Sequence, residues 1–184
     1  MSSLHLTLTE FDHMVNVGAF DVIQRRVELI RGELFEMNPA GPLHDYLITF
    51  LTDWSAEHRD RAKTIITSQT GLTLLAQTSR LEPDLMWLRK ANYRAAHPTA
   101  SDVQLAIEVS YSSLIEDLET KRKLYAEGGI VEYWIVDAMA SCIHVFTRPE
   151  VDQYTSHQVY KSPETLAPQI APTAHLSLTD LFEN

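Results

Sequence analysis

An acidic residue inside an apolar strand is the feature that most constrains this chain. Residues 103–110 have the composition of a buried β-strand, yet the segment contains Glu108. Strand alternation divides the segment into two faces, one with Val103, Leu105, Ile107 and Val109 and the other with Gln104, Ala106, Glu108 and Ser110. An ionised carboxylate almost never enters such surroundings unless a positive charge meets it there. We therefore expect the fold to bring a cation to Glu108.

The helix predicted directly after this strand, over residues 114–127, offers such a cation. At about 100° per residue, its apolar side chains fall within an arc of roughly 120°. They are Leu114, Leu118, Leu124 and Tyr125. Lys121 falls inside this arc and Asp117 near its edge, whereas Lys123 projects to the opposite side. Because the helix must pack back across the sheet, Lys121 can return to the level of Glu108. Lys121 has two alternatives. Its side chain can reach past its apolar neighbours to water, or it can pair with Asp117 alone.

Asp84 is a third candidate for the same site. It opens the apolar run 85–88, directly after Pro83 interrupts the strand predicted over residues 80–88. Taken alone, Asp84 is typical of a turn residue at the start of a strand. Two carboxylates from adjacent strands and one ammonium are, however, the groups that metal-assisted phosphodiester hydrolysis requires. Carboxylate oxygens suit Mg²⁺, and a lysine can orient the water that the metal activates.

The remaining sequence predicts strands interspersed with helices. Helical signals occupy residues 9–18, 43–58 and 114–127. Strand patterns occupy residues 26–30, 33–37, 63–68, 72–76, 80–88, 103–110, 132–137 and 142–147. The tail from residue 162 is irregular until residues 176–182. This order predicts an α/β (α+β) fold, a mixed β-sheet flanked by helices with an N-terminal helix and hairpin. The length favours a single domain over residues 1–184.

Local signals mark the ends of several elements. Thr9 is suited to cap the first helix, and Arg31-Gly32 to form a tight turn between the first two strands. Ser113 followed by Glu116 has the spacing of a capping box, and Gly128-Gly129 is typical of a helix end. We therefore expect the helix that carries Lys121 to run between these last two signals.

Composition and charge narrow the classes of function. Hydrophobic residues at 45% and charged residues at 22% are typical of a globular protein. No apolar run approaches the roughly 18 residues of a membrane span, and the start of the chain does not resemble a signal peptide. We therefore expect a cytoplasmic protein without membrane attachment. The net charge of −10 argues against a broad basic face for nucleic acid. Basic residues cluster at 25–26, 59–63, 89–94 and 121–123. Each cluster can form part of a local groove for nucleic acid or belong to ordinary solvated surface.

The single cysteine excludes an intramolecular disulfide and a zinc cage of thiolates. Cys142 lies in a strand pattern, which favours a small packing residue over a nucleophile. Tyr133 and Trp134 also lie in a strand pattern. We interpret them as sheet core and not as a platform for base stacking.

Taken together, these residues resemble the Uma-two-type endonucleases, a restriction-endonuclease-like family of the PD-(D/E)XK superfamily. The matching stretches are residues 28–33, Asn38-Pro39 followed by His44, Glu82-Pro83-Asp84, residues 107–110, Asp117 to Lys121 to Tyr125, and residues 132–137. Their order and spacing hold from about Val27 to Asp137, and a weaker similarity reaches Leu181-Phe182.

The resemblance implies a restriction-endonuclease-like sheet flanked by helices, with Mg²⁺ or Mn²⁺ bound by Asp84 and Glu108 and with Lys121 as the catalytic lysine. In the wider superfamily the lysine usually lies two residues beyond the glutamate, where this chain has Ser110. The resemblance therefore implies that the lysine has moved onto the following helix. This position agrees with the helical-face argument for Lys121.

Glu33 and His44 are further candidates, because an early acidic residue often completes such sites. Alternatively, Glu33 is only a surface charge on the hairpin, and His44 is only a hydrogen-bonded histidine at the start of a helix. The expected function is a DNA endonuclease, which as a small single-site enzyme would most simply cut both strands as a homodimer. An inactive member of the same fold that binds metal or a partner is the alternative, motivated by the acidic net charge. A metal-assisted hydrolase of another phosphate ester also remains open.

Overall fold

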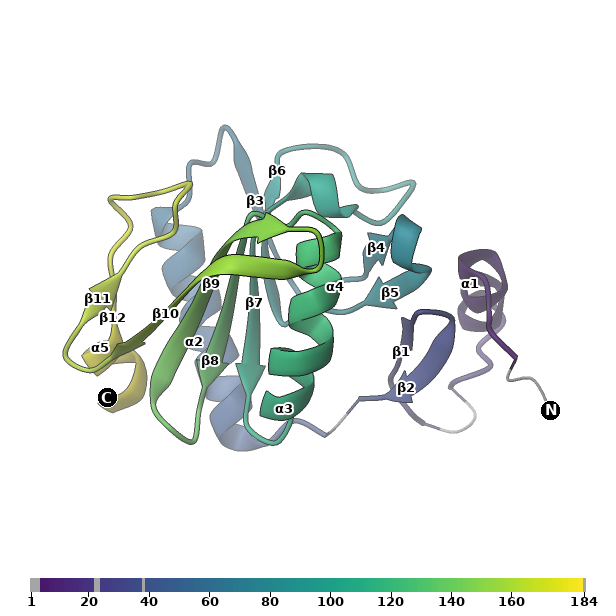
Figure 1. Ribbon diagram of the computed structural model, residues 1–184, viewed down its shortest axis with the longest axis horizontal. Coiled ribbons are helices and arrows are strands. Elements are labelled where there is room, and N and C mark those ends of the chain that lie inside the picture. Colours follow the sequence, from purple (N-terminus) through teal and green to yellow (C-terminus); the bar gives the residue numbers. More distant parts are fainter. Residues whose placement is uncertain (1–3, 22–23, 38, 184) are drawn as a thin grey trace.

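A six-stranded mixed β-sheet forms the centre of the computed structural model, which describes residues 4–21, 24–37 and 39–183 (Figure 1). Its strands lie in the order β10-β9-β8-β7-β6-β3. Their bounds are Thr64–Ser68 for β3, Leu85–Arg89 for β6, Val103–Ser110 for β7, Glu132–Asp137 for β8, Cys142–Glu150 for β9 and Gln153–Lys161 for β10. Strands β7 and β8 run parallel, and the other neighbouring pairs are antiparallel. A parallel pair needs a crossover, which the helix between β7 and β8 supplies.

A four-stranded sheet with the order β2-β1-β5-β4 lies beside the central sheet. Its strands are β1 (Val27–Ile30), β2 (Glu33–Glu36), β4 (Leu72–Leu74) and β5 (Ser79–Leu81). The expected turn at Arg31-Gly32 is confirmed, with left-handed φ angles of 51° and 83°. The single strand predicted over residues 80–88 is wrong, because Glu82-Pro83-Asp84 redirects the chain and leaves β5 and β6 in different sheets.

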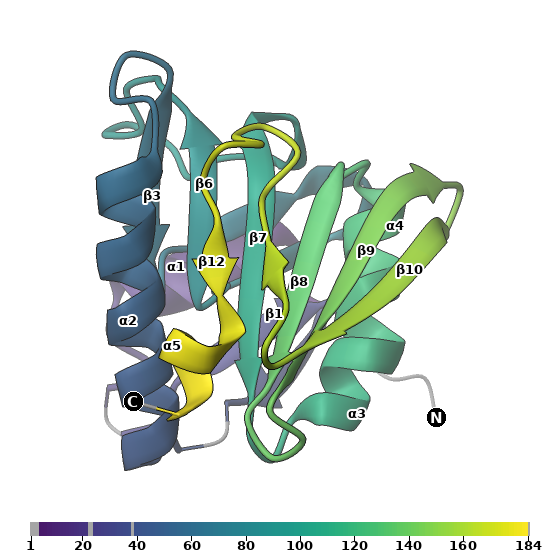
Figure 2. The same cartoon turned by 90° about the vertical axis from the view of Figure 1, so that its left-hand side faces the viewer.

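Helices cover both faces of the central sheet (Figure 2). Helix α2 (Pro42–His58) packs on one face through a buried cluster that contains Leu47, Leu51 and Trp54. The C-terminal segment completes this layer with β11 (Thr165–Leu166), β12 (Leu176–Ser177) and α5 (Leu178–Glu183). The helix between β7 and β8 covers the opposite face, where its residues Leu124 and Tyr125 are buried. Strand β7 is therefore covered on both sides.

The helix between β7 and β8 is continuous but not uniformly α-helical. It consists of α3 (Leu114–Glu116), a π-helical turn (Asp117–Lys121) and α4 (Arg122–Glu127). The expected capping box at Ser113 does not form, because Ser113 Oγ donates to Asp117 Oδ2 at 2.8 Å instead. The expected end at Gly128-Gly129 is confirmed, and Gly129 has the left-handed φ of 78° that favours glycine there.

Helix α1 (Leu8–Asn16) begins earlier than predicted. Thr7, and not Thr9, is the N-cap residue: Thr7 Oγ1 accepts from the Glu10 N–H at 3.2 Å, and Glu10 Oε2 accepts from the Thr7 N–H at 2.8 Å. This reciprocal capping satisfies two main-chain donors at once. Two short 3₁₀ turns lie at Leu75–Gln77 and Ala100–Asp102. Among the described residues, no helix has both the length and the apolar character needed to cross a bilayer.

Strand β7 has the expected bounds, and all eight of its side chains are buried. One face assignment is wrong. Leu105, Ile107 and Val109 lie in the cluster under α2, whereas Val103 lies in the opposite cluster. The cause is a bulge, because Trp87 pairs with Leu105 while its neighbour Leu88 pairs with Val103. One extra residue in β7 reverses the side-chain alternation at its beginning.

Strand β10 has no counterpart among the predicted strands. It is an edge strand whose side chains are mostly exposed, so it lacks the alternation that marks a half-buried strand. Tyr133 and Trp134 of β8 are fully buried, as the interpretation as sheet core requires. Cys142 is also buried. Asn38, quoted in the resemblance, lies outside the described residues.

Candidate functional site

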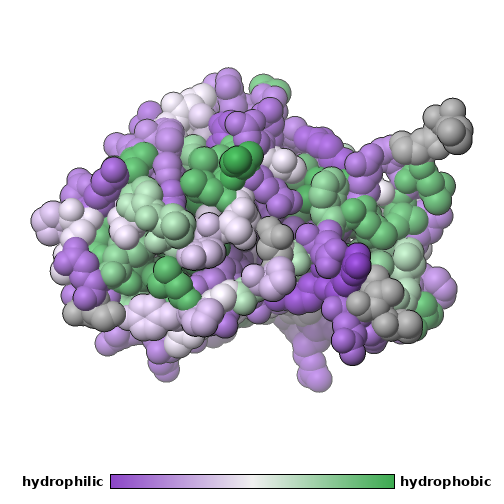
Figure 3. Space-filling model, turned by 90° about the horizontal axis from the view of Figure 1, so that it is seen from below, coloured by the Kyte–Doolittle hydropathy of each residue, from purple (hydrophilic) through white to green (hydrophobic). Residues whose placement is uncertain are grey.

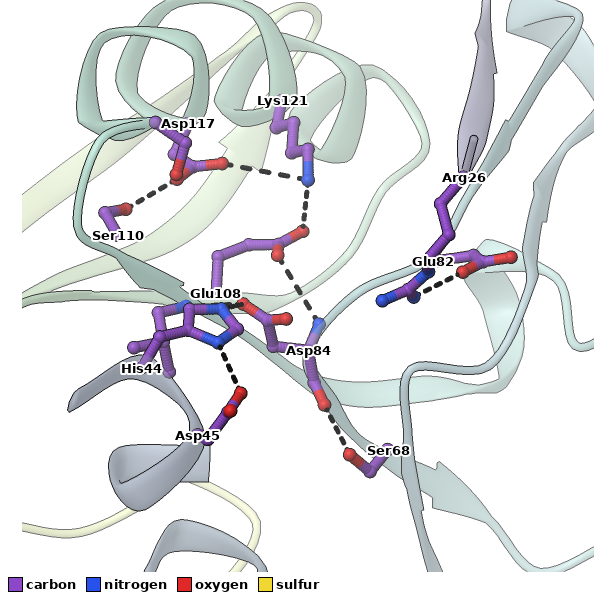
Figure 4. Close-up of polar contacts among 12 residues, drawn as sticks. Arg26, His44, Asp45, Ser68, Glu82, Asp84, Glu108, Ser110, Asp117 and Lys121 are labelled. Carbon is purple, nitrogen blue, oxygen red and sulfur yellow. Dashed lines mark hydrogen bonds and ion pairs between the residues drawn. The ribbon is translucent and has the colours of Figure 1, made fainter. Parts of the chain in front are cut away.

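The candidate site lies where the C-terminal half of β7 meets the start of β6 (Figure 4). Glu108 belongs to β7, and Asp84 precedes β6 by one residue. Leu85 pairs with Ile107, so the two acidic residues occupy neighbouring positions on antiparallel strands. The Val109 N–H donates to Asp84 Oδ2 at 2.8 Å, and the Asp84 N–H lies 3.4 Å from Glu108 Oε2. The main chain thus holds both carboxylates side by side.

Lys121 reaches this pair from the π-helical turn. Its Nζ lies 3.1 Å from Glu108 Oε1, 3.6 Å from Glu28 Oε2 and 3.8 Å from Asp117 Oδ1. The Lys121 residue is 8% exposed, whereas Lys123 is exposed to solvent. The structure therefore brings Lys121 to Glu108 and leaves Lys123 on the outer surface.

Negative charge dominates this buried group. Burial raises the pKa of Glu108 well above its usual range, the Lys121 ammonium opposes this shift, and the neighbouring carboxylates reinforce it. Burial alone would lower the pKa of Lys121, but Glu108, Glu28 and Asp117 raise it well above its usual range. Unit charges about 4 Å apart interact by about 4 kcal/mol at an effective dielectric constant of 20. Three such attractions keep Lys121 charged.

The two oxygens of Glu108 have different surroundings. Oε1 accepts from Lys121 Nζ at 3.1 Å and from the Tyr125 hydroxyl at 2.7 Å. Oε2 lies on the side of Asp84. Tyr125 comes from α4 and is fully buried, so it fixes the Glu108 side chain from the helix side. One oxygen is thus occupied by donors, and the other faces the second carboxylate.

Ser110, which follows Glu108 by two residues, is hydrogen-bonded to Asp117. Ser110 Oγ donates to Asp117 Oδ2 at 2.5 Å, and Ser113 Oγ donates to the same oxygen at 2.8 Å. Asp117 Oδ1 is left facing Lys121. Ser110 therefore anchors the first residue of the π-helical turn, and the last residue of that turn is Lys121. Such turns are frequent at functional sites.

His44 joins the site and Glu33 does not. His44 Nε2, in the first turn of α2, lies 3.4 Å from Asp84 Oδ2. The contact with Asp84 raises the pKa of His44, against the opposing effect of burial. Glu33 follows the turn of the β1–β2 hairpin, is exposed and lies 3.7 Å from His5 Nε2. It sits at the turn end of the hairpin, away from the residues that line the pocket.

Glu28 is a buried acidic residue of the hairpin that reaches the site, and the sequence analysis does not assign it a role. It is 3% exposed, approaches Lys121 and accepts from the Glu82 N–H at 2.7 Å through Oε1. The available signal was its position between apolar residues in β1, the same pattern that singles out Glu108. Its distance from Lys121 depends on how the two sheets meet, which no local pattern shows.

These side chains line one small pocket of about 90 Å³. That volume is well above the about 10–15 Å³ that one water needs. Its polar lining includes Glu28, His44, Asp84, Glu108, Asp117 and Lys121. Carboxylate oxygens predominate, and their charge exceeds that of the single ammonium. This donor set fits a hard divalent cation such as Mg²⁺ or Mn²⁺ that keeps several of its waters.

Comparisons with known proteins agree with this architecture. The model of the Uma2 family, described as "Putative restriction endonuclease", matches residues 14–179. Among solved structures, a crystal structure from Anabaena variabilis, described as "a putative nuclease belonging to DUF820", superposes with a TM-score of 0.73. It is 17% identical, and the match covers 96% of this chain and 97% of that chain. At this identity the likeness shows the fold alone, and the expected fold class is confirmed. No curated protein matches the sequence.

Proposed function

Since the chain belongs to the Uma2 family, we propose that it is a metal-dependent nuclease that hydrolyses phosphodiester bonds in DNA. The observation that carries the proposal is the convergence of the buried side chains of Asp84, Glu108 and Lys121 on one pocket. In this proposal residues 1–184 act as one domain, because the pocket takes side chains from both sheets and from two helices.

Asp84 and Glu108 are the proposed ligands of Mg²⁺ or Mn²⁺. Oε1 of Glu108 is engaged by Lys121 and Tyr125, so Oε2, on the side of Asp84, is the oxygen that remains for an ion. When bound, a divalent cation lowers the pKa of a water and neutralises charge on the phosphate. The excess of buried carboxylates supports this assignment, because a cation would relieve their mutual repulsion.

Lys121 is proposed to orient the attacking water and to offset charge on the phosphate. Its ammonium has three N–H donors, and Glu108 Oε1 occupies one of them. The surrounding carboxylates hold Lys121 charged and restrain its position before substrate binds. Donors that are fixed in advance lower the cost of stabilising charge in the transition state.

His44 is proposed as a positioning residue that acts through Asp84. Its imidazole lies 3.4 Å from Asp84 Oδ2 and 3.6 Å from Asp45 Oδ1. Both carboxylates raise its pKa, with the Asp84 contact contributing most, so they favour the protonated ring. A protonated His44 would fix the Asp84 oxygen that also accepts from the main chain of β7.

The molecular surface on one side has a mixed hydrophilic and hydrophobic character. Figure 3 shows the molecule from below the view of Figure 1, and hydrophilic and hydrophobic patches are interspersed on this face. A single pocket per chain would cut one strand at a time. We therefore propose that two copies act together when both strands are cut.

A non-catalytic metal-binding or partner-binding module is the second candidate function. The net charge of −10 favours it, because a nuclease must approach a polyanion. Several basic side chains are also engaged by carboxylates, with Arg25 paired to Glu36 at 3.0 Å and Arg26 to Glu82 at 2.7 Å. Metal binding without affinity for short DNA at low salt would favour this module.

A cleavage assay tests the nuclease proposal. Purified wild-type protein is incubated with plasmid and with single-stranded DNA in the presence of Mg²⁺ or Mn²⁺. We expect metal-dependent cleavage that falls at least about 100-fold in Glu108→Gln, because that change removes the negative charge that the metal and Lys121 share. Glu33→Gln, at an exposed acidic residue outside the pocket, is the matched control and should cleave like wild type. Equal cleavage by wild type and Glu108→Gln would exclude the assignment.

A further inference from the structure

A second group of metal-ligating side chains lies on the β8–β9 hairpin. Asp137 ends β8, and Cys142 and His144 lie at the start of β9. One carboxylate oxygen, the thiol sulfur and one ring nitrogen lie within 4.8 Å of one another. The strand register explains this, because Asp137 pairs directly with Cys142, and His144 is the next residue of β9 on the same face.

The distance between sulfur and nitrogen matches tetrahedral coordination. Cys142 Sγ lies 3.7 Å from His144 Nε2. Zinc bonds of about 2.3 Å to sulfur and about 2.0–2.1 Å to nitrogen at a tetrahedral angle separate the two ligand atoms by about 3.6 Å. The two atoms are therefore spaced for one ion between them.

Two outer contacts orient these ligands. His144 Nδ1 lies 3.1 Å from His157 Nε2 of β10, and the His157 ring stacks on Phe146 at 4.2 Å. In the tautomer in which His144 Nδ1–H donates to His157, the Nε2 lone pair faces Cys142 Sγ. Asp137 Oδ1 accepts from the N–H groups of Met139 and Ala140 at 3.0 and 2.9 Å, which leaves its other oxygen for an ion.

This group is separate from the nuclease pocket. In the sheet, Glu108 pairs with Ile135, and Ile135 pairs with His144, so a fully buried isoleucine stands between the two sites. None of the three hairpin ligands is among the residues that line the pocket. The ligand chemistry also differs, because thiolate and imidazole select softer cations than carboxylates do.

We propose that Asp137, Cys142 and His144 bind a Zn²⁺ ion, with the fourth position taken by water. The ion would join the end of β8 to the β9–β10 edge of the sheet. His157 is a positioning residue that fixes the tautomer and the orientation of His144. The site does not depend on the proposed nuclease activity.

Cobalt spectroscopy on the full chain tests this site. Chelator-treated protein is titrated with Co²⁺, whose thiolate complexes absorb by charge transfer. Cys142 is the only cysteine in the chain, so this absorption reports the hairpin site alone. We expect the band to saturate at one Co²⁺ per chain, to disappear on addition of Zn²⁺ and to persist in excess Mg²⁺. Absence of the band at saturating Co²⁺ would overturn the proposal, and this result needs no variant.

Variants then locate the ligands. His144→Asn should weaken Co²⁺ binding at least about 10-fold, and His157→Asn by about 10-fold through the lost orienting contact. His175→Gln, at an exposed histidine, is the matched control and should bind like wild type. Glu108→Gln should keep the band, which separates this site from the nuclease pocket. Unchanged affinity in His144→Asn, or one Co²⁺ shared by two chains, would contradict the proposed ligand set.

Discussion

The central sheet carries two polar clusters, the proposed nuclease pocket and the metal-ligating group on the β8–β9 hairpin. The two are built in opposite ways. The proposed nuclease pocket gathers Glu28, His44, Asp84, Glu108 and Lys121 from five separate segments, and carboxylates predominate among these side chains. The hairpin group takes all of its proposed ligands from residues 137–144, with a thiol and an imidazole among them. The first arrangement requires the whole fold, whereas the second requires little more than one strand register.

The two clusters also balance their charges differently. The pocket contains several buried carboxylates around one ammonium, so removal of a single group leaves the others unbalanced. The hairpin group can be satisfied without an ion, because Cys142, His144 and His157 can bond to one another as neutral groups. We therefore expect substitutions in the pocket to destabilise the fold more than substitutions in the hairpin group.

The largest effect is expected for Lys121→Met. The change leaves three buried carboxylates without their shared ammonium and should lower the free energy of unfolding by about 3–5 kcal/mol. Denaturation by urea in the presence of a chelator measures it. Lys123→Met, two residues along on the exposed side, should change stability by no more than about 0.5 kcal/mol. Equal effects of the two substitutions would contradict the charge balance described for the pocket.

Metal ions should stabilise the two clusters independently. At concentrations about 100-fold above their dissociation constants, Mg²⁺ and Zn²⁺ should each raise the free energy of unfolding by about 2.7 kcal/mol. Asp84→Asn should remove only the Mg²⁺ effect, and Cys142→Ser only the Zn²⁺ effect. Chemical denaturation with each ion, and with both together, checks this. Loss of the Zn²⁺ effect in Asp84→Asn would show that the two ions share the pocket.

Ser110→Ala should have an intermediate effect. It removes the short hydrogen bond to Asp117, although Ser113 continues to donate to the same oxygen. Hydrogen bonds to charged groups contribute about 1.5–3 kcal/mol to stability, so we expect the free energy of unfolding to fall by about 1.5 kcal/mol. Ser112→Ala, at an exposed neighbouring serine, serves as the control in the same denaturation experiment. Unchanged stability in Ser110→Ala would contradict the proposed role of Ser110 in anchoring Asp117.

The smallest effect is a pH dependence outside both clusters. Burial raises the pKa of Glu132 above its usual value of 4.5, although the Gln169 and Trp134 N–H groups oppose this shift. The folded protein therefore holds the proton to higher pH than the unfolded chain does. The contribution of Glu132 to stability should fall as pH rises from 4.5 through the folded-state pKa. Glu132→Gln should flatten the dependence of the free energy of unfolding on pH, measured by denaturation at several pH values. An unchanged dependence would refute the assignment to Glu132.

The Glu108–Lys121 contact could be predicted because two strong periodicities meet there. Strand alternation and the helical arc place both residues on buried faces, and the elements are adjacent in sequence. The π-helical turn and the serine contacts to Asp117 adjust this arrangement without displacing Lys121 from it. Short sequence separation and a long strand made this part of the site predictable.

Glu28 could not be predicted in the same way. Its place beside Lys121 depends on how the four-stranded sheet meets the central sheet, which is a long-range property of the fold. Glu33, the predicted hairpin carboxylate, follows the turn and therefore lies at the exposed end of the hairpin. The bulge that turns the Val103 side chain to the other face of the sheet also depends on strand pairing. The same holds for the polar edge strand β10, and local sequence patterns indicate neither feature.

In the proposed function, Asp84 and Glu108 hold the catalytic metal next to Lys121. A crystal structure of the wild-type protein with Mn²⁺ would locate this ion by its anomalous scattering. We predict an anomalous peak in the pocket, about 2.0–2.2 Å from one oxygen of Asp84 and from Glu108 Oε2. An occupied Mn²⁺ site elsewhere with no peak between these two carboxylates would contradict the account.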